Sequence, residues 1–182
     1  AGSGKTRVLT TRLIHIINQK KAFPNQILCV TFTNKAAKEM QNRVMKHIKG
    51  SSNAIPWLGT FHSISVKFLR RHATALGFKS NFTILDKEDQ KKLIKKISEA
   101  EDLDVKKITP QFILAFIDKW KNKGLLPEEM KGNFDPIEKI VLKVYKTYQK
   151  KIKDLNCMDF GDLILYTVKL FERNKDIRSI YQ

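Results

Sequence analysis

The first residues of the chain have the types and spacing that could bind the phosphates of a nucleotide. Gly2, Ser3 and Gly4 would let backbone N–H groups converge on phosphate oxygens. Lys5 could reach the terminal phosphates, and the Thr6 hydroxyl could coordinate Mg²⁺. A helix that begins near Lys5 would direct its positive N-terminal end at the same anion. These residues predict a nucleotide site, although the strand that normally precedes a P-loop would lie before the first residue.

Hydrolysis at such a site also requires an acidic residue at the end of a hydrophobic strand. In this sequence the only hydrophobic run that ends in an acid is Phe82-Thr-Ile-Leu-Asp86. Asp86 is followed by Lys-Glu-Asp and a helical pattern, so its predicted role is to cap that helix. We therefore do not expect the chain to carry the carboxylate that hydrolysis needs.

Charge is distributed very unevenly along the chain. The formal net charge is +17, from 35 Lys plus Arg and 18 Asp plus Glu. Residues 1–80 hold fourteen of the bases and one acid, Glu39, whereas the other 102 residues hold 21 bases and 17 acids. A lysine-rich composition would account for many lysines but not for the near absence of acids in one segment. The pattern predicts that residues 1–80 contact a polyanion.

Other features exclude several classes of protein. The longest apolar runs are shorter than the roughly 18 residues of a membrane-spanning helix, and the basic start is unlike a signal peptide. Cys29 and Cys157 lack the spacing of a zinc site or a disulfide framework, so we expect reduced thiols. These features predict a cytosolic protein without membrane contact.

The first eighty residues alternate short apolar runs with amphipathic segments. This alternation is typical of an α/β layer with a parallel sheet. The apolar spacing predicts helices over residues 5–18, 36–48 and 63–76, and strands over residues 27–33 and 57–61.

From about residue 81 the pattern changes, and we expect strands to be absent. Pro110 and Pro136 stand where the first turn of a helix tolerates proline. The spacing predicts an all-helical insert with helices over residues 87–101, 110–123 and 136–155, followed by helices over 159–174 and from 175 onward.

The segment Cys29-Val-Thr-Phe-Thr-Asn-Lys-Ala-Ala-Lys-Glu-Met40 resembles superfamily 1 DNA helicases of the UvrD/Rep/PcrA type. Three further segments agree with that family: Gly-Lys-Thr-Arg-Val-Leu at residues 4–9, Gly-Thr-Phe-His-Ser at 59–63 and Met-Asp-Phe-Gly-Asp-Leu at 158–163. Their order and spacing cover essentially the whole chain, which makes the resemblance far more specific than the P-loop alone.

The resemblance implies an ATP- and Mg²⁺-dependent motor that moves 3′ to 5′ on single-stranded DNA. Such motors unwind duplexes at junctions between single and double strands, in repair or replication restart in the bacterial cytosol. It also implies a P-loop NTPase fold, with a RecA-like domain 1A in residues 1–80, a helical domain 1B in residues 81–157 and a return to domain 1A in residues 158–182.

The resemblance also implies roles for individual residues. Lys5 and Thr6 would take the catalytic phosphate and Mg²⁺ roles, Arg7 would approach the base of the nucleotide, and Phe32 would stack on DNA bases. The nucleotide set is Ala1, Gly2, Ser3, Gly4, Lys5, Thr6 and Arg7, and the DNA set is Thr31, Phe32, Thr33, Asn34, Lys35, Thr60 and His62.

A full family member also has an Asp-Glu strand and a second motor domain, and neither is recognisable here. We therefore expect a segment that depends on the rest of the helicase and by itself hydrolyses little ATP. Two alternatives stay open: a self-contained P-loop kinase or nucleotidase, and a non-enzymatic nucleic-acid-binding module. The tripeptide Asp159-Phe160-Gly161 spells a protein-kinase motif, but the other kinase motifs are absent, so we interpret it as the start of a helix.

Overall fold

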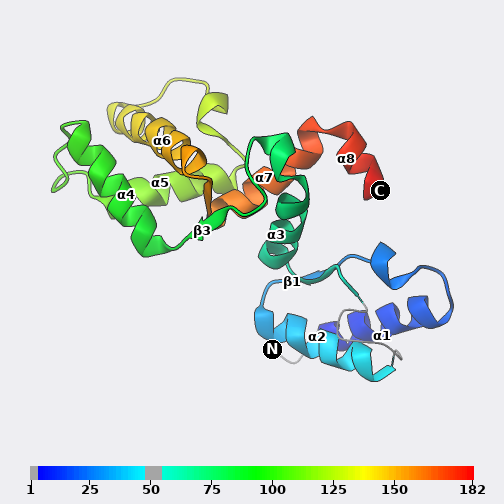
Figure 1. Cartoon of the computed structure of the whole chain (residues 1–182). Helices are drawn as coiled ribbons and strands as arrows, with labels where there is room; N and C mark the ends of the chain where they lie inside the picture. Colours follow the sequence, from blue (N-terminus) through cyan, green and yellow to red (C-terminus); the bar gives the residue numbers. More distant parts are fainter. Residues whose placement is uncertain (1–3, 48–54) are drawn as a thin grey trace. The chain divides into compact units, whose positions relative to one another are not determined.

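The computed structural model describes residues 4–47 and 55–182, which divide into two compact units. The first unit ends at Val66 and the second begins at Lys67. This boundary falls inside helix α3 (Phe61–His72), which is drawn in green in Figure 1. Each unit has a hydrophobic core of its own.

The first unit alternates helices and strands, as predicted. Its elements are α1 (Lys5–Asn18), the 3-10 turn η1 (Pro24–Gln26), β1 (Cys29–Thr31), α2 (Asn34–His47), β2 (Leu58–Thr60) and the first part of α3. Strands β1 and β2 are parallel, so a crossover between them is required, and α2 lies in that connection. Both strands are shorter than predicted because only three residue pairs are in register.

The core of the first unit lies between α1, α2 and the two strands. Leu13 from α1, Met40 and Val44 from α2, and Leu58 from β2 are all buried. Met40 and Val44 are four residues apart and therefore lie on one face of α2. Their burial holds α2 against the sheet and α1.

The second unit is mostly helical, and its helices follow the predicted segments. Its elements after α3 are η2 (Ala73–Leu76), β3 (Thr83–Leu85), α4 (Lys87–Ala100), α5 (Pro110–Asn122), η3 (Pro127–Glu129), α6 (Pro136–Asp154), β4 (Cys157–Asp159), α7 (Phe160–Arg173) and α8 (Lys175–Ile180). Pro110 and Pro136 occupy the first turns of α5 and α6, as predicted. Within the ranges described, no helix combines the length and apolar character needed to cross a membrane.

The expectation that residues 81–157 contain no strand was wrong. Strand β3 pairs in parallel with β4, with Thr83 opposite Cys157 and Leu85 opposite Asp159. The pairing was not visible in the sequence because β3 is only three residues long, is largely exposed and finds its partner far along the chain. The described residues therefore form a mixture of helices and two small parallel sheets, and the three-part domain division stays a proposal.

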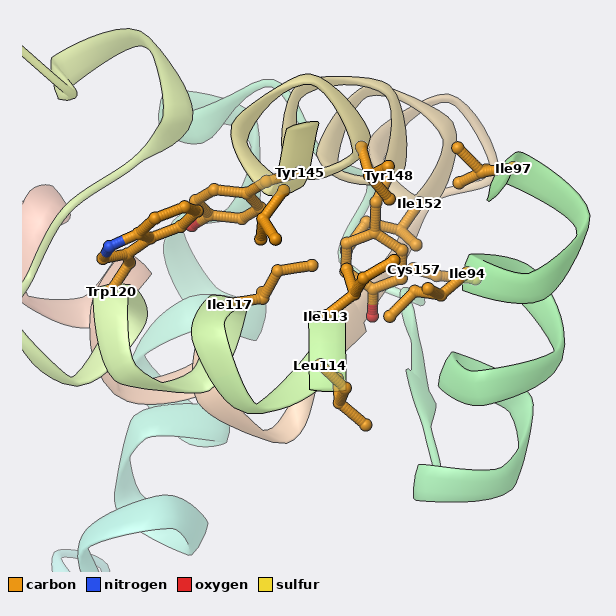
Figure 2. Close-up of a cluster of buried hydrophobic side chains, with 12 residues drawn as sticks. Ile94, Ile97, Ile113, Leu114, Ile117, Trp120, Tyr145, Tyr148, Ile152 and Cys157 are labelled. Atoms are coloured by element: carbon orange, nitrogen blue, oxygen red, sulfur yellow. The ribbon is translucent and has the colours of Figure 1, made fainter. Parts of the chain in front are cut away.

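Helices α4, α5 and α6 lie side by side and enclose the core of the second unit (Figure 1). Figure 2 shows isoleucines from α4 and α5 directed toward Tyr145 and Tyr148 of α6. Trp120 stacks on Tyr145 with ring centroids 5.9 Å apart. Trp120, Tyr145 and Tyr148 are all buried, so these three aromatic residues serve packing.

Two predictions about single side chains are also confirmed. Asp86 caps α4, because its carboxylate accepts the backbone N–H of Asp89 at 2.8 Å. Cys29 and Cys157 are free thiols, and burial raises the pKa of both. A raised pKa keeps a thiol protonated at neutral pH and lowers its reactivity.

Candidate functional site

Gly4 provides the turn that leads into α1. Its φ angle is 68°, in the left-handed region, and a Cβ added there would meet nothing within 4 Å. Glycine is therefore favoured by the backbone angle and not by lack of space. The predicted nucleotide residues Ala1, Gly2 and Ser3 lie outside the described residues.

The first turn of α1 offers cations and no carboxylate. Lys5 and Arg7 are exposed, Thr6 is half-buried, and the turn contains no acid. The Thr6 carbonyl accepts the Thr10 hydroxyl at 2.7 Å inside the helix. An N-terminal turn with this composition favours a bound anion through its free N–H groups and its dipole.

The two predicted DNA-contacting segments meet at one edge of the sheet. Strands β1 and β2 end with Thr31 opposite Thr60. Phe32 and Phe61 follow these residues, and their ring centroids are 5.2 Å apart with a 45° tilt. Because the carboxyl ends of parallel strands are where open sheets place their ligands, this aromatic pair lies at the expected position for a site.

Exposure shows that the two rings do not belong to a core. Phe32 is 88% exposed and Phe61 is 41% exposed. An exposed aromatic pair leaves apolar surface in water, which is unfavourable in free energy. Stacking of a base on the rings would remove part of that surface from water. Phe32 is therefore a surface residue of the first unit.

Both helices that follow the strands begin at this edge. The Thr33 hydroxyl accepts the backbone N–H of Ala36 at 3.2 Å, and Asn34 and Lys35 on the first turn of α2 are exposed. These two side chains are therefore accessible beside Phe32. The first turn of α2 contains no acid, so it too favours an anion.

Thr60 has a more structural position than Phe32. It is 7% exposed, and its hydroxyl accepts the backbone N–H of Ser63 at 3.2 Å. In return, the Ser63 hydroxyl accepts the backbone N–H of Thr60 at 2.9 Å. This reciprocal pair caps α3, and it holds Phe61 at the end of β2.

Gly59 is required by the close approach of α3 to β2. A Cβ at this position would lie 2.5 Å from the Ser63 hydroxyl and 3.3 Å from the Ile64 side chain. Any larger residue would push Ser63 out of the capping pair. Gly59 therefore permits the tight turn that places the aromatic pair.

His62 is half-buried on the first turn of α3. Burial lowers its pKa from the ordinary value of 6.5. The imidazole is therefore neutral at pH 7, and it could contact a ligand by hydrogen bonding but not by charge.

The charge of the first unit is almost entirely positive. Its 66 residues contain ten bases and one acid, Glu39. Glu39 pairs with Arg43 on α2, so it leaves the cations of α1 and of the strand edge uncompensated. A positive surface around exposed aromatic rings is the arrangement that holds a single nucleic-acid strand.

The kinase-like tripeptide at residues 159–161 has a different role. Asp159 is fully buried, and the Lys121 ammonium donates to it at 2.6 Å and to Asp162 at 2.7 Å. Burial acts to raise the pKa of Asp159, but the adjacent Lys121 outweighs it and lowers that pKa. Burial and the Asp159 charge raise the pKa of Asp162 to about 6. Asp159 caps α7 in this network, as the interpretation of a helix start requires.

Comparison with known proteins establishes the family. The model of the UvrD/REP helicase N-terminal domain matches residues 1–182. The chain belongs to the UvrD/REP helicase family. It is 43% identical over its whole length to the ATP-dependent DNA helicase PcrA of Staphylococcus epidermidis and 44% identical to a probable DNA helicase II homolog of Rickettsia felis. It spans 25% and 28% of these relatives, about a quarter of the length of each.

In this UvrD/REP helicase chain, sequence reasoning overlooked Phe61 and Gly59 as parts of the site. A signal for Phe61 was present, because the doublet Thr-Phe stands at the end of both strands, at residues 31–32 and 60–61. Equal positions at the ends of paired parallel strands place the two rings side by side. For Gly59 the signal is visible only once the packing of α3 is known.

Proposed function

We propose that the protein containing this chain is an ATP-dependent helicase that moves 3′ to 5′ along single-stranded DNA and opens its junctions with duplex. The observation that carries the proposal is the register of β1 and β2, which brings Phe32 and Phe61 together at the carboxyl edge of the sheet. Family membership supports the same function, and DNA repair in the cytosol is its proposed setting.

On the DNA side, Phe32 would stack on a base, with Phe61 supporting its ring. Thr33, Asn34 and Lys35 would contact phosphates from the first turn of α2, because that turn is exposed and free of acids. Thr31 and His62 would add hydrogen bonds, and Thr60 would act by holding α3 in place. Stacking contributes about 1–3 kcal/mol per base and is indifferent to sequence, which suits a motor that must move along any strand.

On the nucleotide side, the residues present fit ATP and Mg²⁺. The left-handed turn at Gly4, the exposed Lys5 and the partly exposed Thr6 support a phosphate site at the start of α1. Lys5 would bind the terminal phosphates, the Thr6 hydroxyl would hold Mg²⁺, and Arg7 would approach the base. Mg²⁺ would neutralise the charge that develops on the phosphates.

The proposed architecture is that of a P-loop motor. Residues 1–80 and 158–182 would form the RecA-like domain 1A, and residues 81–157 would form domain 1B. The carboxylates for hydrolysis and a second motor domain would come from the rest of the protein, which is the proposed partner of this segment.

The test is ATP turnover by the intact protein with and without oligothymidine. We expect the single strand to stimulate turnover, and we expect Lys5→Ala to abolish turnover while leaving the salt dependence of DNA binding unchanged. Salt dependence matters because cationic contacts to phosphates release counterions. Turnover that is robust and indifferent to DNA would contradict the proposal and favour a self-contained kinase or nucleotidase.

A further inference from the structure

A fully buried cluster of charged groups joins α5, α6 and the start of α7. Lys121 of α5 lies between Asp159, the last residue of β4, and Asp162 in the first turn of α7, and none of these side chains is more than 1% exposed. One cation faces two carboxylates, so the cluster carries one negative charge in excess when both are ionised. A buried charge that no partner compensates is unfavourable, and a carboxyl group in that situation tends to take up a proton.

Around this cluster the described residues supply no second cation that bonds to Asp162. Lys169, the next base along α7, is engaged by Glu129 and Glu172. The other titratable groups that act on the cluster or on its neighbours are neutral or acidic: Tyr145 and Tyr148 of α6, Tyr166 of α7, Asp118 of α5 and Glu128 of η3. Burial raises the pKa of the three tyrosines from the ordinary value of 10, so they stay neutral at pH 7. The excess charge is therefore not compensated by any other described residue.

Within the described residues, the carboxyl group of Asp162 accepts hydrogen bonds and donates none. Its Oδ1 accepts from the Lys121 ammonium at 2.7 Å and from Nε2 of Gln149 at 2.9 Å. Its Oδ2 accepts from the backbone N–H of Asp159 at 3.1 Å. These three bonds suit an ionised carboxylate, whereas a proton on Asp162 would need an acceptor nearby.

Gln149 holds an acceptor that has no partner. The residue is 6% exposed, and its Nε2 donates to Asp162 and, at 3.0 Å, to the Tyr166 hydroxyl. Its Oε1 is buried and accepts no hydrogen bond from any residue that the structure describes. A rotation of the amide by about 180° exchanges Oε1 and Nε2, which are nearly equal in shape. Oε1 would then accept from a protonated Asp162 and from the Tyr166 hydroxyl, so the amide would again form two hydrogen bonds.

We propose that Asp162 and Gln149 form a proton-sensitive switch that sets how the start of α7 is held against α5 and α6. In the ionised state Nε2 of Gln149 donates to Asp162, and Lys121 bridges two carboxylates. When Asp162 takes up a proton from solvent, the amide rotates and Asp162 donates to Oε1. Lys121 then keeps Asp159 as its single anionic partner, and the cluster is neutral.

The acidities of the two carboxyl groups agree with this assignment of the proton. Burial acts to raise the pKa of Asp159, but Lys121 outweighs burial and lowers that pKa. Burial and the charge of Asp159 raise the pKa of Asp162 to about 6. Asp162 is therefore the group that takes up the proton, although the measured midpoint belongs to the interacting pair.

Nuclear magnetic resonance of the intact protein, labelled with ¹³C-aspartate and ¹⁵N-glutamine, tests the switch without any variant having to fold. Between pH 7 and pH 5 the carboxyl signal of Asp162 and the side-chain amide signal of Gln149 should change together, with one midpoint near 6. In Asp162→Asn the Gln149 signal should stay constant over the same range. The matched control is Asp154→Asn, which removes an exposed carboxylate at the end of α6 and should leave the midpoint unchanged.

Urea unfolding of the same proteins checks the sign. A carboxyl group whose folded pKa is raised stabilises the protein at low pH and loses that contribution as pH rises through the folded pKa. Relative to Asp162→Asn, the unfolding constant of the wild type should therefore fall about tenfold from pH 7 to pH 5, given a shift from 3.8 to about 6. The proposal would be overturned by an Asp162 signal that does not change in this range, by a Gln149 signal that stays constant while Asp162 titrates, or by a Gln149 signal that titrates equally in Asp162→Asn.

Discussion

Replacing Lys121 by methionine should destabilise the second unit strongly. The Lys121 ammonium lies between Asp159 and Asp162 at 2.6 and 2.7 Å, and none of the three side chains is more than 1% exposed. Methionine keeps most of the apolar stem but removes the charge. The variant would therefore leave two buried carboxylates without their cation.

The magnitude follows from that loss. Removing one partner of a buried ion pair costs about 3–5 kcal/mol, because the remaining charge is buried and uncompensated. A whole domain is stable by only about 5–15 kcal/mol, so Lys121→Met would consume a large part of its stability. In the triple variant with Asp159→Asn and Asp162→Asn, no buried charge is left in the network, and we expect most of the loss to be recovered.

Urea unfolding followed by circular dichroism at pH 7 and pH 5 measures the effect. Without Lys121, burial raises the pKa of both carboxyl groups above their unfolded values. Groups with raised folded pKa values stabilise at low pH and lose that contribution as pH rises, so the variant should lie closer to the wild type at pH 5. Exposed Lys123 is the matched control, and Lys123→Met should stay within about 0.5 kcal/mol of the wild type. A Lys121→Met protein that unfolds like the wild type at pH 7, or that loses the same stability at both pH values, would refute this reasoning.

Gly59→Ala should destabilise the protein by about 1–3 kcal/mol in urea unfolding, because the alanine Cβ would displace Ser63 from the cap of α3. A Gly59→Ala variant as stable as the wild type would show that the turn has room for a Cβ. Asp86→Ala should cost about 1 kcal/mol for the lost cap and leave DNA-stimulated ATP turnover unchanged; lost turnover at retained stability would instead place Asp86 in the ATP site. Burial acts to raise the pKa of Glu129, but a hydrogen bond from a backbone N–H and two adjacent cations outweigh burial and lower that pKa to about 2. The ion pairs of Glu129 should therefore stabilise the protein above pH 4.5, and this contribution should disappear as pH falls toward 2. Thermal unfolding at pH 7 and pH 3 measures how much stability Glu129→Gln removes at each pH. An equal loss of stability at both pH values would contradict this.

The helices and the order of elements in the first unit could be predicted because their signals are local. Apolar spacing, the prolines that begin α5 and α6, and the cap at Asp86 each act within a few residues. The start of α1 after Gly4 and the exposed turn at Phe32 are local in the same sense. Four local motifs in the right order were also enough to indicate the family.

The remaining features depend on residues far apart in the chain. Strand β3 is a strand only because β4 pairs with it, and Lys121 is buried only because Asp159 and Asp162, 38 and 41 residues away, neutralise it. A lysine on a helix is ordinarily expected to face solvent. The partnership of Phe32 with Phe61 likewise follows from strand register and not from either segment alone.

The exposed aromatic pair at the sheet edge is the centre of the proposed function, and Phe32→Ala tests it most directly. Fluorescence anisotropy with labelled oligothymidine, at one fixed salt concentration, gives the affinity of the intact protein. Phe23 is the matched control, because it is 72% exposed and precedes β1 instead of following it. We expect Phe32→Ala to weaken binding by about 1–3 kcal/mol, which is roughly five- to 150-fold in Kd, and Phe23→Ala to leave it unchanged. Equal affinity of the Phe32→Ala variant and the wild type would contradict the account.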